Sequence, residues 1–374
     1  MYYRTLGRTG LSVSEIGMGC EGFLNKSPEE TKQMVDLMES AGVNCIDMYT
    51  PNPAFRTNLG LALRGRREKF VLQAHLCTIW KDGQYKRTRE PEEMREGFED
   101  LLTRLDTEAV EIGMIHYVDA MEDWKQVLEG PAMAYARELK AQGKIRHIGM
   151  SFHDKPEVLD RILTEQPCIE AVQLQFNYLD AYDPVVQGMD CLQVCRKHNK
   201  PVIVMEPVKG GSLMNLPEEA KAILDSLGGG SYASYAIRYA ASADGVMMVL
   251  SGMSSTEQMA DNLSFMADFR PLDQAEYAAL DRVRGVFGRM DLIPCTACHY
   301  CTDGCPMHIN IPSLFSSLNA RTMFGGDSGS SSFAMGIKGG GKPSDCVSCG
   351  QCEAACPQQL AIRRLLKKVS AQFE

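Results

Sequence analysis

The sequence predicts an α/β protein made of a closed (β/α)8 barrel followed by a smaller, mainly α-helical domain. Three observations predict this fold class. Short apolar runs alternate with amphipathic segments between Glu15 and Met253, about eight such runs are present, and a cysteine-rich segment follows them. The chain has 374 residues, more than one domain usually contains, so we divide it into a barrel over residues 1–285 and a second domain over 286–374.

Each apolar run is short enough for a buried strand of a parallel sheet. The runs are Glu15–Met18, Asn44–Met48, Phe70–Leu76, Val110–Val118, Ile145–Phe152, Ala171–Tyr178, Pro201–Pro207 and Gly245–Gly252. The alternative is an open, doubly wound sheet. No Gly-x-Gly-x-x-Gly follows the first run, and the count of eight favours closure into a TIM-type barrel.

Helices are predicted between these runs and after the last one. Pro28–Ser40 is opened by Ser27 with Glu30 three residues on, which is the pattern of a capping box. A helix is predicted over Ser255–Ala267 and another after Pro271. The stretch 325–341 is rich in Gly and Ser, which predicts a flexible or loosely ordered loop, as a linker rather than a lid.

Composition excludes several functional classes. Hydrophobic residues make up 44% and charged residues 23%, which is typical of a folded globular protein. A net charge of −9 predicts neither a nucleic-acid nor an anionic-membrane partner. The sequence has no apolar stretch of membrane-spanning length and no signal-peptide core at its start, so we expect a cytoplasmic protein whose partners are small molecules and redox proteins.

Eight of the fourteen cysteines form two runs with identical spacing, Cys-x2-Cys-x2-Cys-x3-Cys-Pro. The first contains Cys295, Cys298, Cys301 and Cys305, and the second contains Cys346, Cys349, Cys352 and Cys356. In this bacterial ferredoxin pattern the fourth cysteine of each run ligates the other cluster. The spacing therefore predicts two [4Fe-4S] clusters, one on Cys295, Cys298, Cys301 and Cys356, the other on Cys346, Cys349, Cys352 and Cys305.

Two other uses of these cysteines are less favoured. Zinc ribbons have paired Cys-x2-Cys knuckles but not a third cysteine and a Cys-Pro ending. Disulfides are rare where thiols are kept reduced. The remaining cysteines lack ligand spacing and are expected to be small buried residues: Cys20, Cys45, Cys77, Cys168, Cys191 and Cys195. About forty residues separate the two runs, so the domain resembles the all-helical ferredoxin domains of multi-subunit reductases.

The N-terminal part resembles the aldo-keto reductase family over about residues 1–270. The segments that carry the resemblance are Tyr3–Ser14, Gly42–Asp47, Gly143–Ser151, Ser251–Ser254, Glu257–Gln258 and Asp261–Asn262. A branch of this family is fused to a ferredoxin domain, and this chain is similar to that branch.

The resemblance implies four catalytic positions. In the family a Tyr donates a proton to the substrate carbonyl, a Lys lowers its pKa, an Asp supports the Lys and a His orients the carbonyl. Asp47 matches the Asp and His116 matches the His, whereas Asn52 stands where the Tyr is expected and His75 where the Lys is expected. An amide does not ionise usefully and an imidazole is only a conditional cation, so the family chemistry must be altered.

Two groups are candidates for the missing proton donor. An imidazole whose pKa is near neutrality acts as a general acid without a lysine, so His116 is the first candidate, with His75 influencing its charge. Tyr49, two residues after Asp47, is the second if its phenol turns inward. The site has positional support, because six polar residues fall near the carboxyl ends of predicted strands: Asp47, His75, His116, Ser151, Gln173 and Glu206.

The loop after the third run contains polar, aromatic and basic residues, namely Thr78, Trp80, Lys81, Gln84, Tyr85, Lys86 and Arg87. Two interpretations are open: a pocket wall for a ring-bearing or anionic substrate, or a solvated charged loop, which is the commoner case.

The resemblance also implies a nicotinamide nucleotide, NADPH or NADH. It places the nicotinamide against Ser151, Gln173 and Asn177, and the pyrophosphate near Gly210, Gly211, Ser212 and Gly252, with Ser254, Gln258 and Asn262 in the nucleotide segment. Gln258 stands where NADPH-binding members often have an Arg, and Met205 where a stacking aromatic is expected, so affinity is expected to be reduced or shifted towards NADH.

The leading hypothesis is an oxidoreductase whose barrel binds NAD(P)H and a small-molecule substrate and whose two clusters exchange electrons with it or with an external ferredoxin or flavoprotein. One alternative is a catalytically silent barrel that serves electron transfer or ligand binding. Another is a plain NAD(P)-dependent dehydrogenase with structural clusters.

Overall fold

The computed structural model describes residues 1–118, 125 and 130–374. Its strands are β1 (Tyr3–Thr5), β2 (Ser12–Ser14), β3 (Ile16–Gly19), β4 (Cys45–Met48), β5 (Val71–Leu76), β6 (Thr78–Lys81), β7 (Gln84–Arg87), β8 (Val110–Val118), β9 (Ile145–Phe152), β10 (Ala171–Gln175), β11 (Val202–Met205) and β12 (Val246–Ser251). The chain divides into two compact units, residues 1–210 with 230–273 and residues 211–229 with 274–374.

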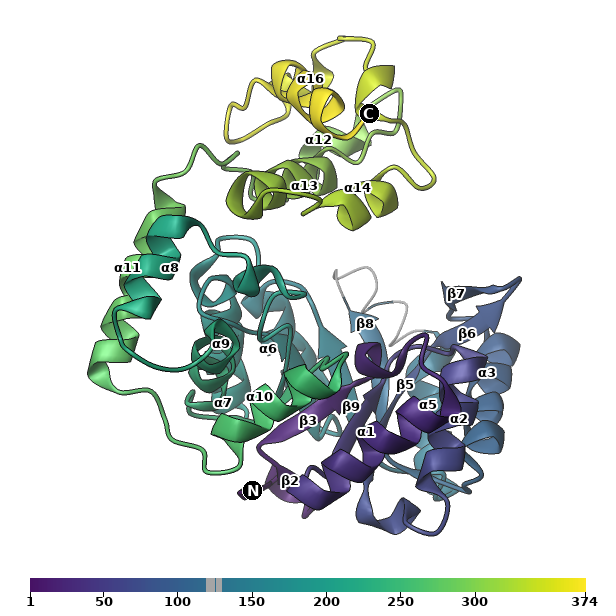
Figure 1. Cartoon of the computed structure of the whole chain (residues 1–374). Coiled ribbons are helices and arrows are strands. Elements are labelled where there is room, and N and C mark those ends of the chain that lie inside the picture. Colours follow the sequence, from purple (N-terminus) through teal and green to yellow (C-terminus); the bar gives the residue numbers. More distant parts are fainter. Residues whose placement is uncertain (119–124, 126–129) are drawn as a thin grey trace. The chain divides into compact units, whose positions relative to one another are not determined.

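Eight parallel strands close into a barrel in the order β3-β4-β5-β8-β9-β10-β11-β12, with β12 pairing back onto β3 (Figure 1). The predicted barrel is therefore confirmed and the open sheet is excluded. Each of the eight predicted runs overlaps one of these strands. The hairpin of β1 and β2 lies outside this ring as a separate two-stranded sheet.

Helices follow most of the strands and lie outside the ring (Figure 1). In the first unit they are α1 (Pro28–Ala41), α2 (Pro53–Leu63), α3 (Pro91–Leu105), α5 (Pro131–Ala141), α6 (Pro156–Glu165), α7 (Gly188–Lys197), α9 (Tyr232–Ala241) and α10 (Thr256–Met266). The predicted capping box at the start of α1 is present, because the Glu30 N–H donates to Ser27 Oγ at 3.1 Å and the Ser27 N–H donates to Glu30 Oε2 at 2.8 Å.

The barrel interior is apolar at one end and polar at the other. Leu6 and Val13 from the N-terminal segment pack with inward residues of the strands, including Cys45, Val71 and Ile112. Further along the same strands the inward positions change to polar side chains, because residues two apart on a strand share a face. The carboxyl ends of the strands therefore hold the candidate site.

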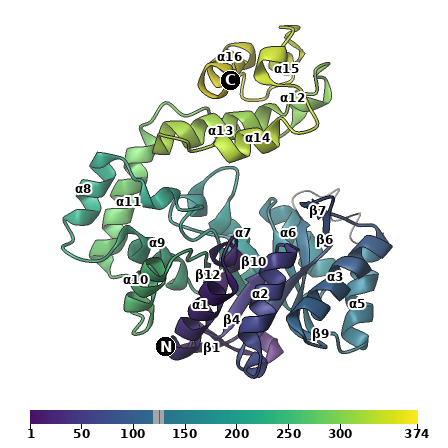
Figure 2. The same cartoon turned by 45° about the vertical axis from the view of Figure 1, so that its right-hand side comes forward.

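The second unit is helical and has its own core (Figure 2). Its helices are α8 (Glu218–Asp225), α11 (Gln274–Gly288), α12 (Tyr300–Asp303), α13 (Ile311–Phe324), α14 (Ser330–Gly336), α15 (Gln351–Ala354) and α16 (Ile362–Phe373). Fully buried side chains such as Leu314, Phe315 and Val369 join α13 to α16.

The prediction of a loosely ordered loop over 325–341 is wrong. The segment contains α14, whose Phe333 is 8% exposed and stacks on Phe373 with ring centroids 4.7 Å apart. Its glycines permit close packing rather than disorder: Gly329 has φ +82°, and a Cβ there would lie 2.2 Å from the Ser317 carbonyl oxygen. A glycine-rich composition alone does not distinguish these two uses.

No helix in the described parts of the chain has the length and apolar character needed to cross a membrane.

Candidate functional site

The barrel site is built from inward residues at the carboxyl ends of β4, β5, β8 and β10. Asp47 is in register with Gln73 of the next strand, and Gln73 and His75 lie two apart on one face of β5. His116 occupies the inward face of β8, and Gln173 that of β10. All five residues are at most 5% exposed.

Hydrogen bonds join these side chains into one chain. His75 Nε2 lies 2.9 Å from Asp47 Oδ1, and His75 Nδ1 lies 2.6 Å from His116 Nδ1. Gln73 Nε2 donates to Asp47 Oδ1 at 2.7 Å and also to Gln173 Oε1. The structure thus brings together the predicted residues Asp47, His75 and His116, as the strand register requires.

His116 also carries a contact that the sequence did not predict. Its Nε2 lies 2.7 Å from the phenol oxygen of Tyr85, and its backbone carbonyl accepts from Arg89 at 3.2 Å. Burial lowers the pKa of His116 well below its usual range, and the nearby His75 and His153 lower it further. The imidazole is therefore neutral near pH 7, with both ring nitrogens engaged, which does not suit the predicted role of an imidazolium acid.

Tyr85 reaches the site because the loop after β5 is an antiparallel hairpin. Strands β6 and β7 pair through the register Trp80 with Tyr85, and a two-residue turn, Asp82-Gly83, connects them with φ of +53° and +74°. Asp-Gly between two extended runs is a strong hairpin signal, and it was the one sequence feature that would have located this residue. Because the hairpin brings Tyr85 to His116, it supports, for this residue, the interpretation of the loop as a pocket wall.

Tyr49, the predicted alternative donor, lies at the end of β4 against Tyr85, with ring centroids 6.5 Å apart. Its phenol is hydrogen-bonded to Glu21, and burial together with the neighbouring Cys20 and Glu21 raises its pKa. Burial likewise raises the pKa of Glu21. Both groups therefore tend to keep their protons.

Asn52 has a structural use. It is the N-cap of α2, where its Oδ1 accepts from the Phe55 N–H at 3.0 Å. The side chain at the position expected for the family tyrosine is thus engaged with the helix backbone.

The residues predicted to hold the nicotinamide differ in how many of their hydrogen-bonding groups are already engaged within the protein. Ser151 Oγ lies 3.2 Å from His153 Nε2, and Gln173 Oε1 accepts from Gln73. Asn177 is fully buried, and its Nδ2 donates both to Asp180 Oδ2 at 2.6 Å and to the Glu206 carbonyl at 2.9 Å. The donors of Asn177 are thus used by its own loop and by the segment that follows β11.

Both segments predicted to bind phosphate contain glycines. The first has the backbone of a tight turn, and in the second the glycine is exposed. Gly210 and Gly211 have φ of +59° and +85°, and Ser212 begins a short 3-10 helix. In the segment after β12, Gly252, Ser254 and Gln258 are exposed. Gln258 Oε1 accepts from the Ser254 N–H at 2.8 Å and from its hydroxyl at 3.0 Å. Asn262 is buried and donates to Ser251 Oγ at 2.8 Å.

The eight cysteines of the second unit line two cavities. One is lined by Cys295, Cys298, Cys301 and Cys356, the other by Cys305, Cys346, Cys349 and Cys352. Each cavity therefore has three cysteines of one run and the fourth of the other. Within the described ranges no three His, Cys, Asp or Glu side chains converge closely enough for one metal ion. The remaining six cysteines lie in the first unit, most of them buried.

The two cavities have related backbones. Non-helical, left-handed residues recur at corresponding positions of the two runs: Ala297, His299 and His308 in the first, and Ser348, Gly350 and Gln359 in the second. Such residues are rare without a special reason, and successive backbone N–H groups in these turns form concave anion sites. Burial raises the pKa of Cys295, Cys301 and Cys352, so these thiols stay protonated unless a metal replaces the proton.

Comparison with known proteins assigns both units. Residues 15–284 match the model of the aldo/keto reductase family, and residues 294–361 match a 4Fe-4S dicluster domain. The chain belongs to the aldo/keto reductase family. Fused to this reductase barrel is a 4Fe-4S dicluster domain, as the resemblance implied.

Two curated relatives of this aldo/keto reductase come from bacteria. An uncharacterized oxidoreductase of Bacillus subtilis, YqkF, is 23% identical over 308 residues, covering 75% of this chain and 95% of that protein. An NADH-specific methylglyoxal reductase of Escherichia coli is 25% identical over 229 residues, covering 56% of this chain and 68% of that protein.

Solved structures agree on the barrel. The aldo-keto reductase AKR11C1 of Bacillus halodurans, in its holo form, has a TM-score of 0.64 and 24% identity, covering 76% of this chain and 96% of that chain. An aldo-keto reductase of Klebsiella pneumoniae in complex with NADPH has a TM-score of 0.59 and 20% identity, with the same coverage. These likenesses support the fold of the barrel.

Proposed function

We propose that this aldo/keto reductase is an iron–sulfur oxidoreductase that binds NAD(P)H and a small-molecule substrate in its barrel and relays electrons through two [4Fe-4S] clusters. The observation that carries the proposal is the pair of four-cysteine cavities in the same chain as a buried, hydrogen-bonded barrel site. Hydride chemistry alone needs no iron, so the second unit adds a one-electron function.

The donor sets of the two cavities fit a cubane each. Four thiols of mixed origin match the cross-ligation that this cysteine spacing predicts, with Cys356 completing the first set and Cys305 the second. When bound, the clusters supply one-electron transfer. A compartment that keeps thiols reduced, such as the cytoplasm, and a ferredoxin or flavoprotein partner suit this function.

The fit of a nicotinamide nucleotide is supported by fewer side chains than the fit of the clusters. Ser151 and Gln173 lie at the polar ends of β9 and β10, where the resemblance places the nicotinamide amide, and Asn177 supports the adjoining loop through Asp180. For the phosphates, the resemblance implies one segment with Gly210, Gly211 and Ser212 and another with Gly252, Ser254, Gln258 and Asn262, and glycines in each let backbone N–H groups approach an anion.

In the barrel, Asp47, His75 and His116 hold and move protons, and Tyr49 is the predicted phenol beside them. This set replaces the Tyr and Lys that the family resemblance implies, with Asn52 and His75 at those positions.

The test is one anaerobic sample of the whole chain, titrated with NADH and NADPH while fluorescence and the visible spectrum of the clusters are followed. The proposal expects nicotinamide binding and reduction of the clusters by the bound nucleotide or by a reduced flavoprotein. Intact clusters without nicotinamide binding would instead indicate a silent barrel. Nicotinamide-dependent turnover with clusters that no reductant bleaches would indicate a plain dehydrogenase with structural clusters.

A further inference from the structure

The hydrogen-bonded chain from Tyr85 to Asp47 has one consistent arrangement of protons when both imidazoles are neutral. A carboxylate only accepts, so His75 Nε2 carries a hydrogen and donates to Asp47 Oδ1. His75 Nδ1 is then an acceptor and takes its hydrogen bond from His116 Nδ1. His116 Nε2 in turn accepts from the Tyr85 hydroxyl. The phenol hydrogen thus points into the chain.

One added proton reverses the hydrogen bonds between His75 and His116 and between His116 and Tyr85, and leaves the one between His75 and Asp47 unchanged. His75 then donates from both nitrogens, to Asp47 on one side and to His116 Nδ1 on the other. His116 stays neutral with its hydrogen on Nε2, which donates to the Tyr85 oxygen. The hydrogen of the phenol is thereby released from the chain. Asp47 stabilises the cationic state, in which His75 carries the charge that a lysine would otherwise supply.

We infer that Tyr85 is the proton donor of this site, and that His116 and His75 pass it a replacement proton with Asp47 as the counterion. This inference rests on the proposed function. In carbonyl reduction a reduced nicotinamide held at Ser151 and Gln173 would supply the hydride for the new C–H bond, and the carbonyl oxygen takes the Tyr85 hydrogen. The proton on His116 Nε2 moves to Tyr85, that on His75 Nδ1 moves to His116, and the network ends neutral.

The neutral network is suited to the reverse reaction. An alcohol gives its proton to the Tyr85 oxygen, the Tyr85 hydrogen passes to His116 Nε2, and the His116 Nδ1 hydrogen passes to His75 Nδ1. A bound oxidised nicotinamide would accept the hydride. Carbonyl reduction therefore requires the network with the added proton, so a lower pH favours reduction. A higher pH favours oxidation.

The surroundings favour Tyr85 over Tyr49. The groups that face the network are Glu21 and Tyr49 from the β3 and β4 ends, His153 after β9, and Arg87 and Arg89 from the end of the hairpin and the segment after it. Burial first, and then His75, His153 and the two guanidinium groups, lower the pKa of His116, which keeps it an uncharged carrier between His75 and Tyr85. Tyr49 is hydrogen-bonded to a carboxyl group instead of an imidazole.

The experiment combines a structural and a kinetic measurement on the whole chain with its clusters. ¹⁵N NMR of labelled histidines reports which ring nitrogens carry hydrogen, and oxidation of NADH and NADPH is followed with methylglyoxal as the carbonyl probe. At high pH we expect His75 with hydrogen on Nε2 and His116 with hydrogen on Nδ1. At lower pH we expect His75 doubly protonated and His116 with hydrogen on Nε2.

Tyr85→Phe is expected to lower kcat by about 10²-fold or more while leaving nicotinamide affinity and iron content unchanged. The matched control is Tyr3→Phe, which removes the phenol hydrogen bond to the Gly42 carbonyl before β4, at the opposite end of the barrel strands. Wild-type reduction should be faster under conditions in which NMR shows the second hydrogen arrangement than under those in which it shows the first.

The other outcomes overturn the inference. A doubly protonated His116 or a His75 with hydrogen only on Nδ1 contradicts the relay, whatever the activity. Activity retained in Tyr85→Phe and abolished in Tyr49→Phe assigns the donor to Tyr49. If the wild type oxidises neither nucleotide with the probe while the tautomers are as stated, the proposed function fails separately, and the network is only structural.

Discussion

At the residue scale, the barrel shows how one side chain can occupy a family position and serve another purpose. Asn52 stands where the resemblance implies the catalytic tyrosine, yet its amide caps α2 through the Phe55 N–H. His75 stands where a lysine is implied and joins Asp47 to His116. The chemistry that we propose for this site therefore depends on the imidazoles and phenols of one hydrogen-bonded chain.

The cap of α2 gives a first prediction. Asn52→Ala should lower the free energy of unfolding by about 1 kcal/mol, because the Phe55 N–H loses its acceptor. Asn52→Asp is the matched control and should retain most of the stability, since a carboxylate also accepts there. Thermal unfolding of the holoprotein measures both. Equal stability of all three proteins would show that the cap contributes nothing.

The nucleotide segment gives a second prediction at this scale. Gln258 is exposed and its Oε1 is bound to Ser254. If Gln258 faces the 2′-phosphate, Gln258→Arg should increase the preference for NADPH over NADH, because a guanidinium offers a fixed fork of donors. Competitive fluorescence titration with the two nucleotides measures the change. An unchanged ratio would mean that this position does not face the 2′-phosphate.

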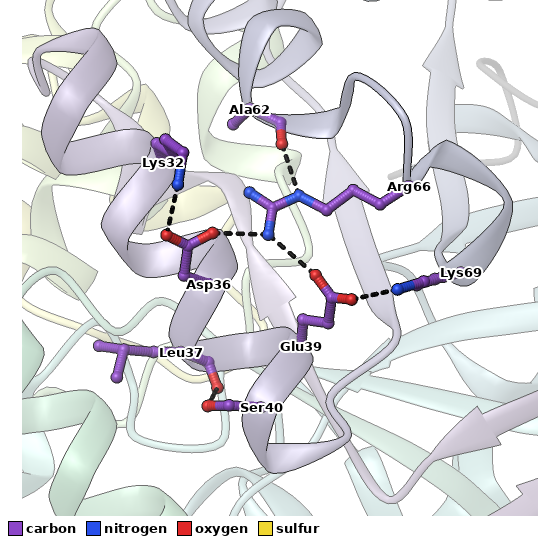
Figure 3. A network of polar contacts seen from close by, with 8 residues as sticks. All are labelled: Lys32, Asp36, Leu37, Glu39, Ser40, Ala62, Arg66 and Lys69. Atoms are coloured by element: carbon purple, nitrogen blue, oxygen red, sulfur yellow. Dashed lines mark hydrogen bonds and ion pairs between the residues drawn. The ribbon is translucent and has the colours of Figure 1, made fainter.

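At the scale of elements, a polar cluster ties α1 to the end of α2 (Figure 3). Arg66 donates through Nε to the Ala62 carbonyl at 2.7 Å and through Nη1 to Asp36 at 2.6 Å and to Glu39 at 2.9 Å. Lys69 adds a further ion pair with Glu39. The side chain of Arg66 is only 13% exposed, so its stem also covers apolar surface between the two helices.

A third prediction follows from this cluster. Arg66→Met should lower the free energy of unfolding by about 1–2 kcal/mol, because three hydrogen bonds across two helices are lost while the packing of the stem is retained. Lys32→Met is the control, since Lys32 makes an exposed pair with Asp36 within α1 alone, and it should have no measurable effect. Thermal unfolding at low and high salt separates the two variants. An Arg66→Met protein as stable as the control would contradict the prediction.

The hairpin of β6 and β7 shows a second effect of element geometry. A two-residue turn fixes the register, and the register places Tyr85 opposite Trp80 with its phenol at His116. A change in turn length would rotate the side chains of β7 to the other face.

At the scale of the whole molecule, the chain combines a reductase barrel with a dicluster domain. The two cysteine runs are interleaved in space, because each cavity takes its fourth cysteine from the other run. The stability of the second unit is therefore expected to depend on its metal content, since neither set of ligands is complete within one run.

The fourth prediction concerns metal content and ligation. Anaerobically prepared protein should contain about eight irons and eight labile sulfides per chain. Cys356→Ser should alter the same cluster signals, measured by electron paramagnetic resonance after reduction, as Cys295→Ser does. Cys168→Ser is the matched control, because Cys168 lies outside both cavities, and it should retain all the iron.

Cross-ligation would be refuted if Cys356→Ser matched Cys346→Ser instead. Four irons per chain, or zinc in their place, would refute the assignment of two cubanes.

The barrel and the second domain were both predictable from local patterns in the sequence. The period of apolar runs located all eight strands, since burial on both faces of a parallel sheet leaves a strong local signal. It also predicted the two sets of four cysteines that line the cavities, because their spacing reflects the shape of a cubane. Asp47, His75 and His116 were predicted to lie near one another, because parallel strands end at the same rim.

The contacts that these groups make depend, in contrast, on tertiary packing. The contact of Tyr85 with His116 joins residues 31 apart through a hairpin that lies outside the barrel ring, and no local pattern encodes that distance. The lowered pKa of His116 arises from burial and from charges on other elements, which sequence position does not reveal. The helix α14 formed in a glycine-rich segment because α13 and Phe373 gave it a surface to pack on. Local composition sets what a segment can form, whereas long-range packing decides which possibility is stable.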